Sequence, residues 1–243
     1  IFSSGSLKQK ESLGVFYAAF TEFLGFRRSE GEFKFMGMSA YGKKIINLDK
    51  IIKIKSNNRI YLSKHLTMEN KIPITSTYEP MVNVTYLKRI LGKKYHRKSN
   101  SKKFTQDHFD LALSVQKKYE EILIHYIKEF KGNNTSLCMS GGCALNCLAN
   151  ASLEKYFKKI YVMPAASDRG LSIGSAYGGA ILNKIKTKSL DNMFLGINYS
   201  DKEIENQLNL AGIKYKKTNK YISAARDLKN KKIIGWFQGK SEF

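Results

Sequence analysis

Residues 137–176 read LCMSGGCALNCLANASLEKYFKKIYVMPAASDRGLSIGSA, and this stretch decides the fold class. It predicts two successive strand–loop–helix units, with strands at 136–139 and 160–163 and helices at 144–157 and 170–185. Alternating strands and helices are typical of an α/β fold with a parallel or mixed sheet and right-handed crossovers. Because loops at the ends of neighbouring strands can converge on one ligand, the stretch also marks a candidate site.

The first loop carries paired glycines, Gly141 and Gly142, which let a ligand approach the backbone without interference from a Cβ. The start of the following helix offers free N–H groups and a positive dipole end, which favour phosphate. Asn146 lies in its first turn, where its amide is expected to face a ribose or base. A tight strand-to-helix turn without a ligand explains the glycines equally well, so the pattern alone leaves both interpretations open.

The second loop places Asp168 between the end of a strand and the start of a helix. In that position a carboxylate serves either as a helix N-cap or as a metal ligand, and the position alone favours the cap. Gly170, Gly174 and Gly178 recur every four residues on the following helix. Close packing of one helix face against the sheet explains these glycines without a ligand.

Apolar spacing predicts two further helices, over 8–26 and over about 106–130, with Thr105 as the candidate N-cap of the second. The first helix presents an apolar face made of Leu13, Phe16, Phe20, Phe23 and Leu24. The second has an inner stripe of Phe109, Ala112, Gln116, Tyr119, Leu123, Tyr126 and Phe130. Both helices are therefore expected to pack on the sheet.

Three segments between these helices have different patterns. Glycines punctuate residues 30–44 as a turn–helix–turn segment, and residues 51–62 predict a β-hairpin. Residues 63–104 are polar, basic and weakly patterned, which predicts an irregular surface insertion. Within the first segment, GEFKFMG alternates charge and Phe around Glu32 and Lys34, which is typical of a half-buried segment facing a cleft. An exposed ion pair is the simpler alternative.

A domain boundary is expected at 191–198, where the pattern changes. Residues 201–215 and 224–243 each predict a helix followed by a strand, as the start of a second domain. The first residue is not Met, so the chain is expected to begin inside a longer protein.

The composition restricts the class of partner. The net charge of +22 comes from 42 Lys and Arg against 20 Asp and Glu, scattered along the chain with Ile and Asn. A nucleic-acid binder would cluster Arg with aromatic residues, so this pattern disfavours a nucleic-acid partner. The 42% hydrophobic content supports a core, while no apolar stretch is long enough to span a membrane. With no export signal, a cytoplasmic protein without a membrane partner is expected.

The cysteines and histidines do not have the spacing of a metal centre. Cys138, Cys143 and Cys147 lack the spacing of a zinc finger or ribbon, and core packing is the expected role of each. An odd number of cysteines in a chain without an export signal fits a reducing compartment. No ligand spacing relates the histidines, which are His65, His96, His108 and His125.

Six segments taken in order form a recognisable set: SLGVFYAAFTEFLGF, EGEFKFMGMSAYG, LCMSGGCALNCLAN, PAASDRGLSIGSAYGGA, FLGINYS and IIGWFQGKSEF. This set resembles the O-carbamoyltransferase family that modifies nodulation factors and antibiotics, over nearly the whole chain apart from residues 45–104. The resemblance implies an actin-like ATPase (ribonuclease H-like) domain in 1–190, incomplete at its N-terminus. It also implies the truncated start of a second, α+β domain in 193–243.

The resemblance also implies a reaction. Family enzymes form carbamoyl-adenylate from carbamoyl phosphate and ATP, and then pass the carbamoyl group to a hydroxyl of a small-molecule or glycan acceptor. A divalent metal, expected to be iron, lies in the N-terminal site. The nucleotide-binding positions that the resemblance implies are Glu32, Lys34, Gly141, Gly142 and Asn146. In the same way Asp168 matches an acidic metal ligand.

Two parts of the family pattern have no match in this sequence. The family's histidine metal ligands lie upstream of the region that resembles Ile1, and its carbamoyl-phosphate motif begins just after Glu242. The chain is therefore expected to be a central fragment that is inactive alone. Two alternatives stay open: an RNA-binding or tRNA-modifying protein related to the threonylcarbamoylation ATPase, and a sugar-kinase-like phosphotransferase.

Overall fold

The computed structural model describes residues 12–56, 59–68, 81–99, 101, 103–190 and 192–242. It has a mixed α/β structure of helices and small sheets. The chain divides into two compact units, Ile1–Gly174 and Ser175–Phe243. The domain boundary expected between residues 190 and 193 stays a prediction.

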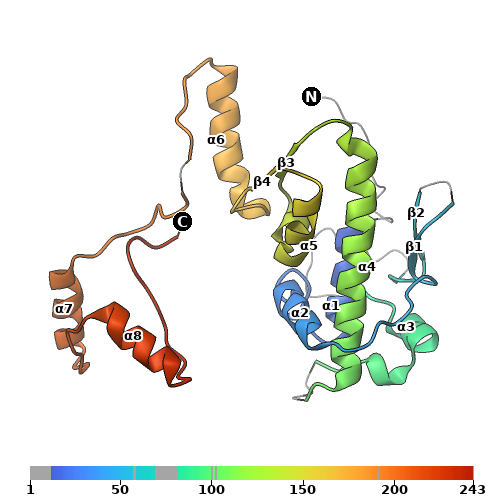
Figure 1. Cartoon of the computed structure of the whole chain (residues 1–243), viewed down its shortest axis with the longest axis horizontal. Helices are drawn as coiled ribbons and strands as arrows, with labels where there is room; N and C mark the ends of the chain where they lie inside the picture. The colour runs from blue at the N-terminus through green and yellow to red at the C-terminus, as the bar shows by residue number, and fades with distance from the viewer. Residues whose placement is uncertain are drawn as a thin grey trace. The chain divides into compact units, whose positions relative to one another are not determined.

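The long helix α4 (Gln106–Lys131) runs the length of the first unit. The other helices of the unit are α1 (Leu13–Phe23), α2 (Glu32–Met38), α3 (Val84–Leu91) and α5 (Cys147–Ser152). Its strands are β1 (Ile52–Ile54), β2 (Ile60–Leu62), β3 (Ser136–Met139) and β4 (Lys159–Val162). Figure 1 shows α5 on one side of α4 and the β1–β2 hairpin on the other.

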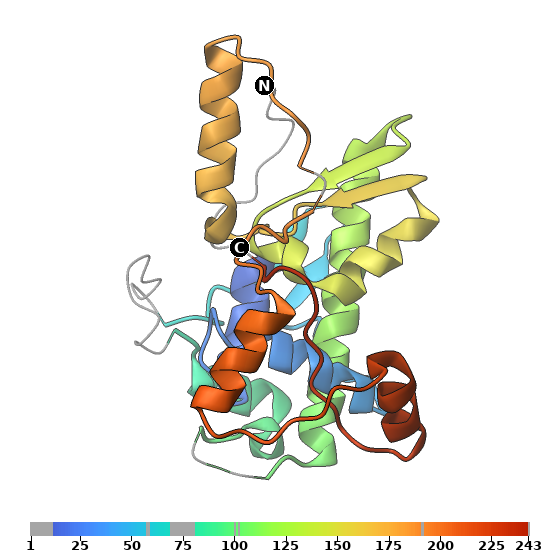
Figure 2. The ribbon, with the colours of Figure 1, turned by 90° about the vertical axis from the view of Figure 1, so that its left-hand side faces the viewer.

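Each sheet contains two strands. β1 and β2 pair antiparallel with Ile52 opposite Leu62, which confirms the predicted hairpin. β3 and β4 pair in parallel with Ser136 opposite Lys159, and Figure 2 shows them side by side. The predicted strand 136–139 is confirmed, and the second predicted strand begins one residue earlier than expected.

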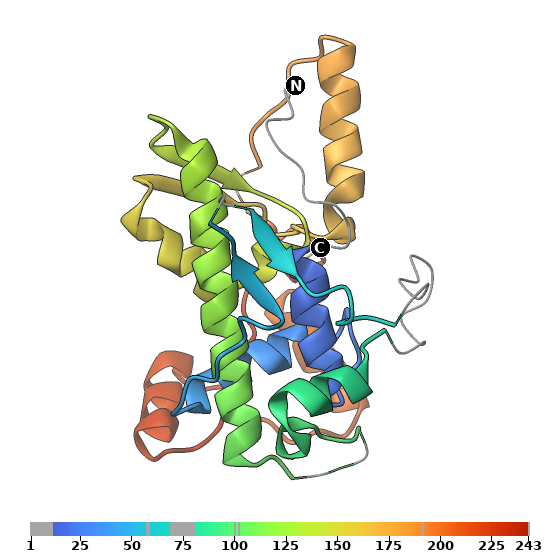
Figure 3. The ribbon, with the colours of Figure 1, turned by 90° about the vertical axis from the view of Figure 1, so that its right-hand side faces the viewer.

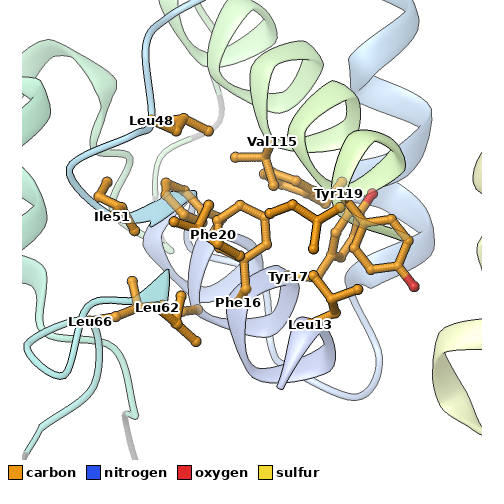
Figure 4. Packing of buried hydrophobic residues seen from close by; sticks show 14 of the residues in the cluster. Leu13, Phe16, Tyr17, Phe20, Leu48, Ile51, Leu62, Leu66, Val115 and Tyr119 are labelled. Atoms are coloured by element: carbon orange, nitrogen blue, oxygen red, sulfur yellow. The ribbon is translucent and has the colours of Figure 1, made fainter. Parts of the chain in front are cut away.

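The core lies between α1, α4 and the hairpin. Phe16 and Phe20 on α1 are fully buried and contact each other edge-to-face, with ring centroids 5.2 Å apart. In Figure 4, Leu48, Ile51, Leu62 and Val115 of α4 lie around these rings. Figure 3 shows the hairpin against α1 and α4. The predicted apolar face of the first helix is confirmed by the burial of Leu13, Phe16, Phe20, Phe23 and Leu24.

The predicted inner stripe of α4 is also confirmed, but the buried face of the helix is wider than the predicted stripe. The buried members of the stripe are Ala112, Gln116, Tyr119 and Leu123, while Phe109 and Tyr126 are half-buried and the Phe130 side chain lies outside the description. Leu111, Val115 and Ile122 are also fully buried, because the core covers a wider arc of α4 than one stripe. Thr105 is the N-cap as predicted, and its N–H donates to Nδ1 of His108 at 3.0 Å.

The prediction of an irregular surface insertion at 63–104 is wrong for its described part. This region contains α3 and a 3₁₀ helix, Lys93–Tyr95, and its buried apolar residues are Leu66, Met81, Val82, Tyr86 and Leu87. Glu22 on α1 holds the residues just before α3 in place. The Glu22 carboxylate accepts hydrogen bonds from the N–H groups of Met81 and Val82 at 3.0 and 2.9 Å. Residues 69–80 lie outside the described residues. A few apolar residues in a basic background sufficed to anchor the segment.

The single helix predicted over 144–157 is wrong as well. The chain forms a 3₁₀ helix at Gly142–Leu145, then α5, then a second 3₁₀ helix at Leu153–Lys155. Asn146 caps α5 by accepting the N–H of Ala149 at 3.0 Å. Asn side chains compete with the helical backbone for hydrogen bonds, and such competition starts a new helix in mid-segment.

Three helices lie at or beyond the division between the units: α6 (Leu171–Leu182), which runs across it, α7 (Asp201–Leu210) and α8 (Lys220–Lys229). The strands predicted after α7 and α8 are absent from the described residues, where 211–219 and 231–242 form no ladder. A strand requires a partner strand, and outside their helices the described residues of the second unit form only isolated backbone bonds, such as Gly196 N–H to Ser241 O at 3.0 Å. Among the described residues, no helix is both long enough and apolar enough to cross a membrane.

Candidate functional site

The glycine loop, residues Ser140–Cys143, joins β3 to the residues that precede α5. The N–H of Gly141 donates to the carbonyl of Ala166 at 2.5 Å, which ties this loop to the loop that follows β4. On the other side, the Tyr119 hydroxyl donates to the carbonyl of Cys143 at 3.2 Å. The two loops expected to converge therefore do so, and the glycine loop is held from both sides.

The two glycines themselves are exposed. Gly141 has φ of 89°, a conformation that favours glycine. Gly142 has no such requirement, and no described atom lies within 4 Å of the position that a Cβ would take on either residue. Tight packing within the described chain therefore does not explain Gly142. Its backbone is open to a molecule that approaches closely.

Asn146 faces the protein interior instead of the open side of the loop. Its side chain is 9% exposed and pairs with the amide of Gln116 through two reciprocal hydrogen bonds of 3.0 Å. Its Oδ1 also accepts from the N–H of Ala149. The expected contact between this amide and a ribose or base stays a prediction, and the structure shows Asn146 as a cap.

Sequence reasoning missed three polar side chains that surround Asn146. The Tyr17 hydroxyl donates to Gln116 Oε1 at 2.8 Å, and Gln116 Nε2 donates to Glu120 Oε1 at 2.9 Å. Burial raises the pKa of the Tyr17 phenol, a hydrogen bond from Asn146 opposes this, and the charges of Glu32 and Glu120 raise the pKa further. The sequence held one signal, because Gln116 is the polar residue in the predicted apolar stripe of α4.

Glu32 acts on the same phenol as Asn146, because its charge raises the pKa of Tyr17. Glu32 is the first residue of α2, and its Oε1 accepts the N–H of Ser29 at 2.8 Å. One turn later on α2, the sulfur of Met36 lies 3.9 Å from that of Cys147. The structure thus brings α2, at Met36, to the residues that follow the glycine loop, although they are far apart in sequence.

Lys34 points elsewhere. It is exposed, and its ammonium lies 5.6 Å from the ring centroid of Phe33, which is 65% exposed. The structure therefore links Glu32 to Tyr17 through its charge alone and leaves Lys34 on an open surface.

Asp168 is exposed and is the first residue of a 3₁₀ helix, Asp168–Gly170, that leads into α6. Ser167 is the N-cap of this helix, so the prediction of Asp168 as the cap is wrong. A divalent cation needs several ligands, and the described residues contain no group of three His, Cys, Asp or Glu able to hold one. Asp168 by itself does not complete a metal centre.

Close packing of α6 against the sheet does not explain the glycines after Asp168: Gly170 precedes α6, and the residue that it contacts closely, Ala165, lies in the loop after β4. A Cβ on Gly170 would clash with the carbonyl oxygen of Ala165. Apart from the chain neighbours and the backbone of α6 itself, no described atom lies within 4 Å of a Cβ built on Gly174 or Gly178. Packing among the described residues therefore does not require glycine at either position.

The cysteines are free and exposed, so the expected core role is wrong for each of them, Cys138, Cys143 and Cys147. On β3 the reason is strand alternation, since Leu137 and Met139 pack against the core and the residue between them faces away. Cys143 and Cys147 lie in the loop and at the start of α5 on the exposed side, while Ala144 and Ala149 are the buried apolar residues of this segment.

Comparisons with known proteins match most of the chain. A family model described as the carbamoyltransferase N-terminus matches residues 2–177. An uncharacterised protein of Synechocystis sp. is 31% identical over 258 residues, which cover 96% of this chain and 39% of that protein. Nodulation protein NolNO of Sinorhizobium fredii is 29% identical over 251 residues, covering 97% of this chain and 33% of that protein. Nodulation protein NolO of Bradyrhizobium diazoefficiens is 26% identical over 253 residues, covering 98% and 42%. The chain thus spans well under half the length of these relatives.

Proposed function

The chain belongs to the carbamoyltransferase family, and on that premise we propose that it forms the nucleotide-binding part of an ATP-dependent O-carbamoyltransferase. The complete protein would form carbamoyl-adenylate from carbamoyl phosphate and ATP. It would then transfer the carbamoyl group to a hydroxyl of a small-molecule or glycan acceptor. We further propose that the first unit is part of an actin-like ATPase domain, with β3 and β4 as neighbouring strands of its sheet.

The openness of Gly142 carries this proposal. The loop around it is anchored to Ala166 and Tyr119, yet nothing in the described chain fills the space beside it. Among the described residues, the N–H groups of Gly142 and Cys143 have no acceptor. Successive free N–H groups in a turn form a concave site for anionic oxygens. An anchored, open loop with free donors suits the phosphates of a nucleotide.

The remaining residues take roles around that loop. Glu32, beside Tyr17, is proposed to bind the hydroxyls of the ribose, and Lys34 lies next to it in sequence. Asn146 is proposed to contribute to nucleotide binding indirectly, by holding the glycine loop in place. Asp168 lies on the neighbouring loop and is the proposed contact to a cation, for which the described residues supply no further ligand.

The test compares Gly142→Val with wild type in the complete protein. The branched side chain would occupy the space proposed for the phosphates. We therefore expect ATP affinity to fall about tenfold or more, which corresponds to a loss of about 1.4 kcal/mol of binding free energy. Because no described atom outside the neighbouring residues lies within 4 Å of a Cβ at this position, the free energy of unfolding should change by less than about 0.5 kcal/mol. Isothermal titration with ATP and urea denaturation measure the two quantities.

A matched control is Gly179→Ala on α6, another glycine without a positive φ or a neighbour within 4 Å. It should leave ATP affinity unchanged. Unchanged ATP affinity in Gly142→Val would refute the site. ADP release driven by a sugar without carbamoyl phosphate would indicate a phosphotransferase instead, and salt-sensitive RNA retention would indicate a nucleic-acid partner.

A further inference from the structure

The amide of Gln116 uses all four of its hydrogen-bonding positions, although it is 1% exposed. Its Oε1 accepts from the Tyr17 hydroxyl at 2.8 Å and from Asn146 Nδ2 at 3.0 Å. Its Nε2 donates to Asn146 Oδ1 at 3.0 Å and to Glu120 Oε1 at 2.9 Å. A buried amide with every position satisfied is costly to rotate, because rotation would leave several buried groups unpaired.

Glu120 determines which way this amide points. Its carboxylate, which also binds the ammonium of Lys117 at 2.9 Å, can only accept hydrogen bonds. The nitrogen of Gln116 must therefore face Glu120, and its oxygen must face Tyr17. Complementarity then requires Asn146 to present its oxygen to Gln116 Nε2 and its nitrogen to Gln116 Oε1. The Glu120 carboxylate thus fixes the orientation of the Gln116 amide, and the Gln116 amide fixes that of Asn146.

The orientation of Asn146 in turn fixes the glycine loop. With its oxygen in this position, Asn146 accepts the N–H of Ala149 and starts α5. Its own backbone N–H donates to the carbonyl of Cys143 at 3.2 Å, the carbonyl that also accepts from Tyr119. The end of the loop is therefore held by two donors, while Gly141 and Gly142 stay open.

We propose that Gln116 is a positioning residue for nucleotide binding: it orients Asn146 and, through Asn146, holds the glycine loop in its binding conformation before ATP arrives. A preformed loop avoids the entropy cost of ordering on binding. The inference rests on the proposed function, because it takes ATP as the ligand of this loop. Gln116 itself touches no substrate in this scheme.

The test uses Gln116→Met in the complete protein, a change that keeps side-chain length and removes the amide. We expect the KM for ATP to rise about tenfold, while kcat at saturating ATP and the KM for carbamoyl phosphate stay within about twofold. The matched control is Gln106→Met on the same helix. Gln106 Nε2 likewise donates to a carboxylate four residues later, that of Asp110, at 2.8 Å. This control should lower stability without changing the KM for ATP.

A second variant covers the case in which Gln116→Met does not fold. Glu120→Gln can either donate or accept, so it no longer dictates the orientation of Gln116, and we expect the KM for ATP to rise about threefold. If the folded Gln116 variant, or Glu120→Gln in its place, leaves the KM for ATP unchanged while wild type binds ATP, Gln116 is structural only and the inference is wrong. If wild type binds no ATP, the proposed function fails and the inference fails with it.

Discussion

Asp110 shows how a buried charge is retained in this fold. It is 5% exposed on α4, and its carboxylate accepts from the N–H of Lys43 at 2.7 Å and from Gln106 Nε2 at 2.8 Å. Burial alone would raise the pKa of Asp110. The hydrogen bonds from Lys43, Gln106 and Lys44 outweigh it, and the pKa lies below its ordinary value of 3.8. The charged form is thus the one that the fold stabilises.

Asp110→Asn is expected to destabilise the chain by about 1–3 kcal/mol at pH 7, because the amide is a weaker acceptor and brings an unpaired donor. A lowered folded pKa gives stability that is present above pH 3.8 and lost as the pH falls through the folded value. Wild type should therefore lose more stability than the variant on acidification. Urea denaturation at neutral and acidic pH measures both.

The control for this prediction is Asp49→Asn. Asp49 is a surface residue paired with Lys118, and its side chain is 52% exposed. The Asp49→Asn substitution should lower the free energy of unfolding by less than about 1 kcal/mol, because exposed ion pairs contribute little to stability. Equal losses in the two variants at neutral pH would contradict the assigned role of Asp110.

At the scale of the elements, a cationic side chain lies beside two stacked aromatic rings, one just after α1 and the other just before α4. The guanidinium of Arg97 lies 4.2 Å from the ring centroid of Phe104 and 5.8 Å from that of Phe26, and the two rings stack at 5.7 Å. Nη1 of Arg97 donates to the carbonyl of Leu24, just after α1, at 2.9 Å. The segment after α3 is thereby attached to the end of one helix and the start of the other.

Arg97→Lys is expected to destabilise the chain by about 1–2 kcal/mol, although it keeps the charge. A lysine ammonium lacks the planar face that stacks on the rings and has fewer directed donors. The control is Arg89→Lys, an exposed arginine whose guanidinium lies 5.8 Å from the ring of Tyr86, which should change stability by less than about 0.5 kcal/mol. Thermal and urea denaturation compare them, and equal effects would show that stacking contributes nothing.

At the scale of the whole molecule, buried apolar residues are unevenly distributed. They lie almost entirely in the first unit, whereas Met193 is the buried apolar residue of 175–243 among those described. The helices α7 and α8 are each 10 residues long and bury no residue. Isolated helices of that length are marginal in water even with good caps.

We therefore expect residues 1–174 produced alone to unfold cooperatively and residues 175–243 alone to show little helix. Circular dichroism with thermal denaturation tests both segments. A cooperative transition in the isolated 175–243 segment would contradict the expectation, since it would require a core that the described residues do not form.

The features that depend on local pattern were predictable from the sequence. The apolar faces of α1 and α4, the cap at Thr105, the hairpin and the strand at 136–139 all follow from side-chain period and from residues next to one another. The glycine loop and its neighbour after β4 were found in the same way, because each immediately follows a strand. The α/β class was predictable for that reason.

Tertiary structure alone decided which side chains meet and which face water. Gln116 lies 30 residues from Asn146 and 99 from Tyr17, so no local pattern could join them. The burial of α3, the exposure of the cysteines and the break before α5 also depend on what packs against each segment. Hydrogen-bond partners and burial are set by contacts between distant parts of the chain, whereas periodicity reports only which face of a segment is apolar.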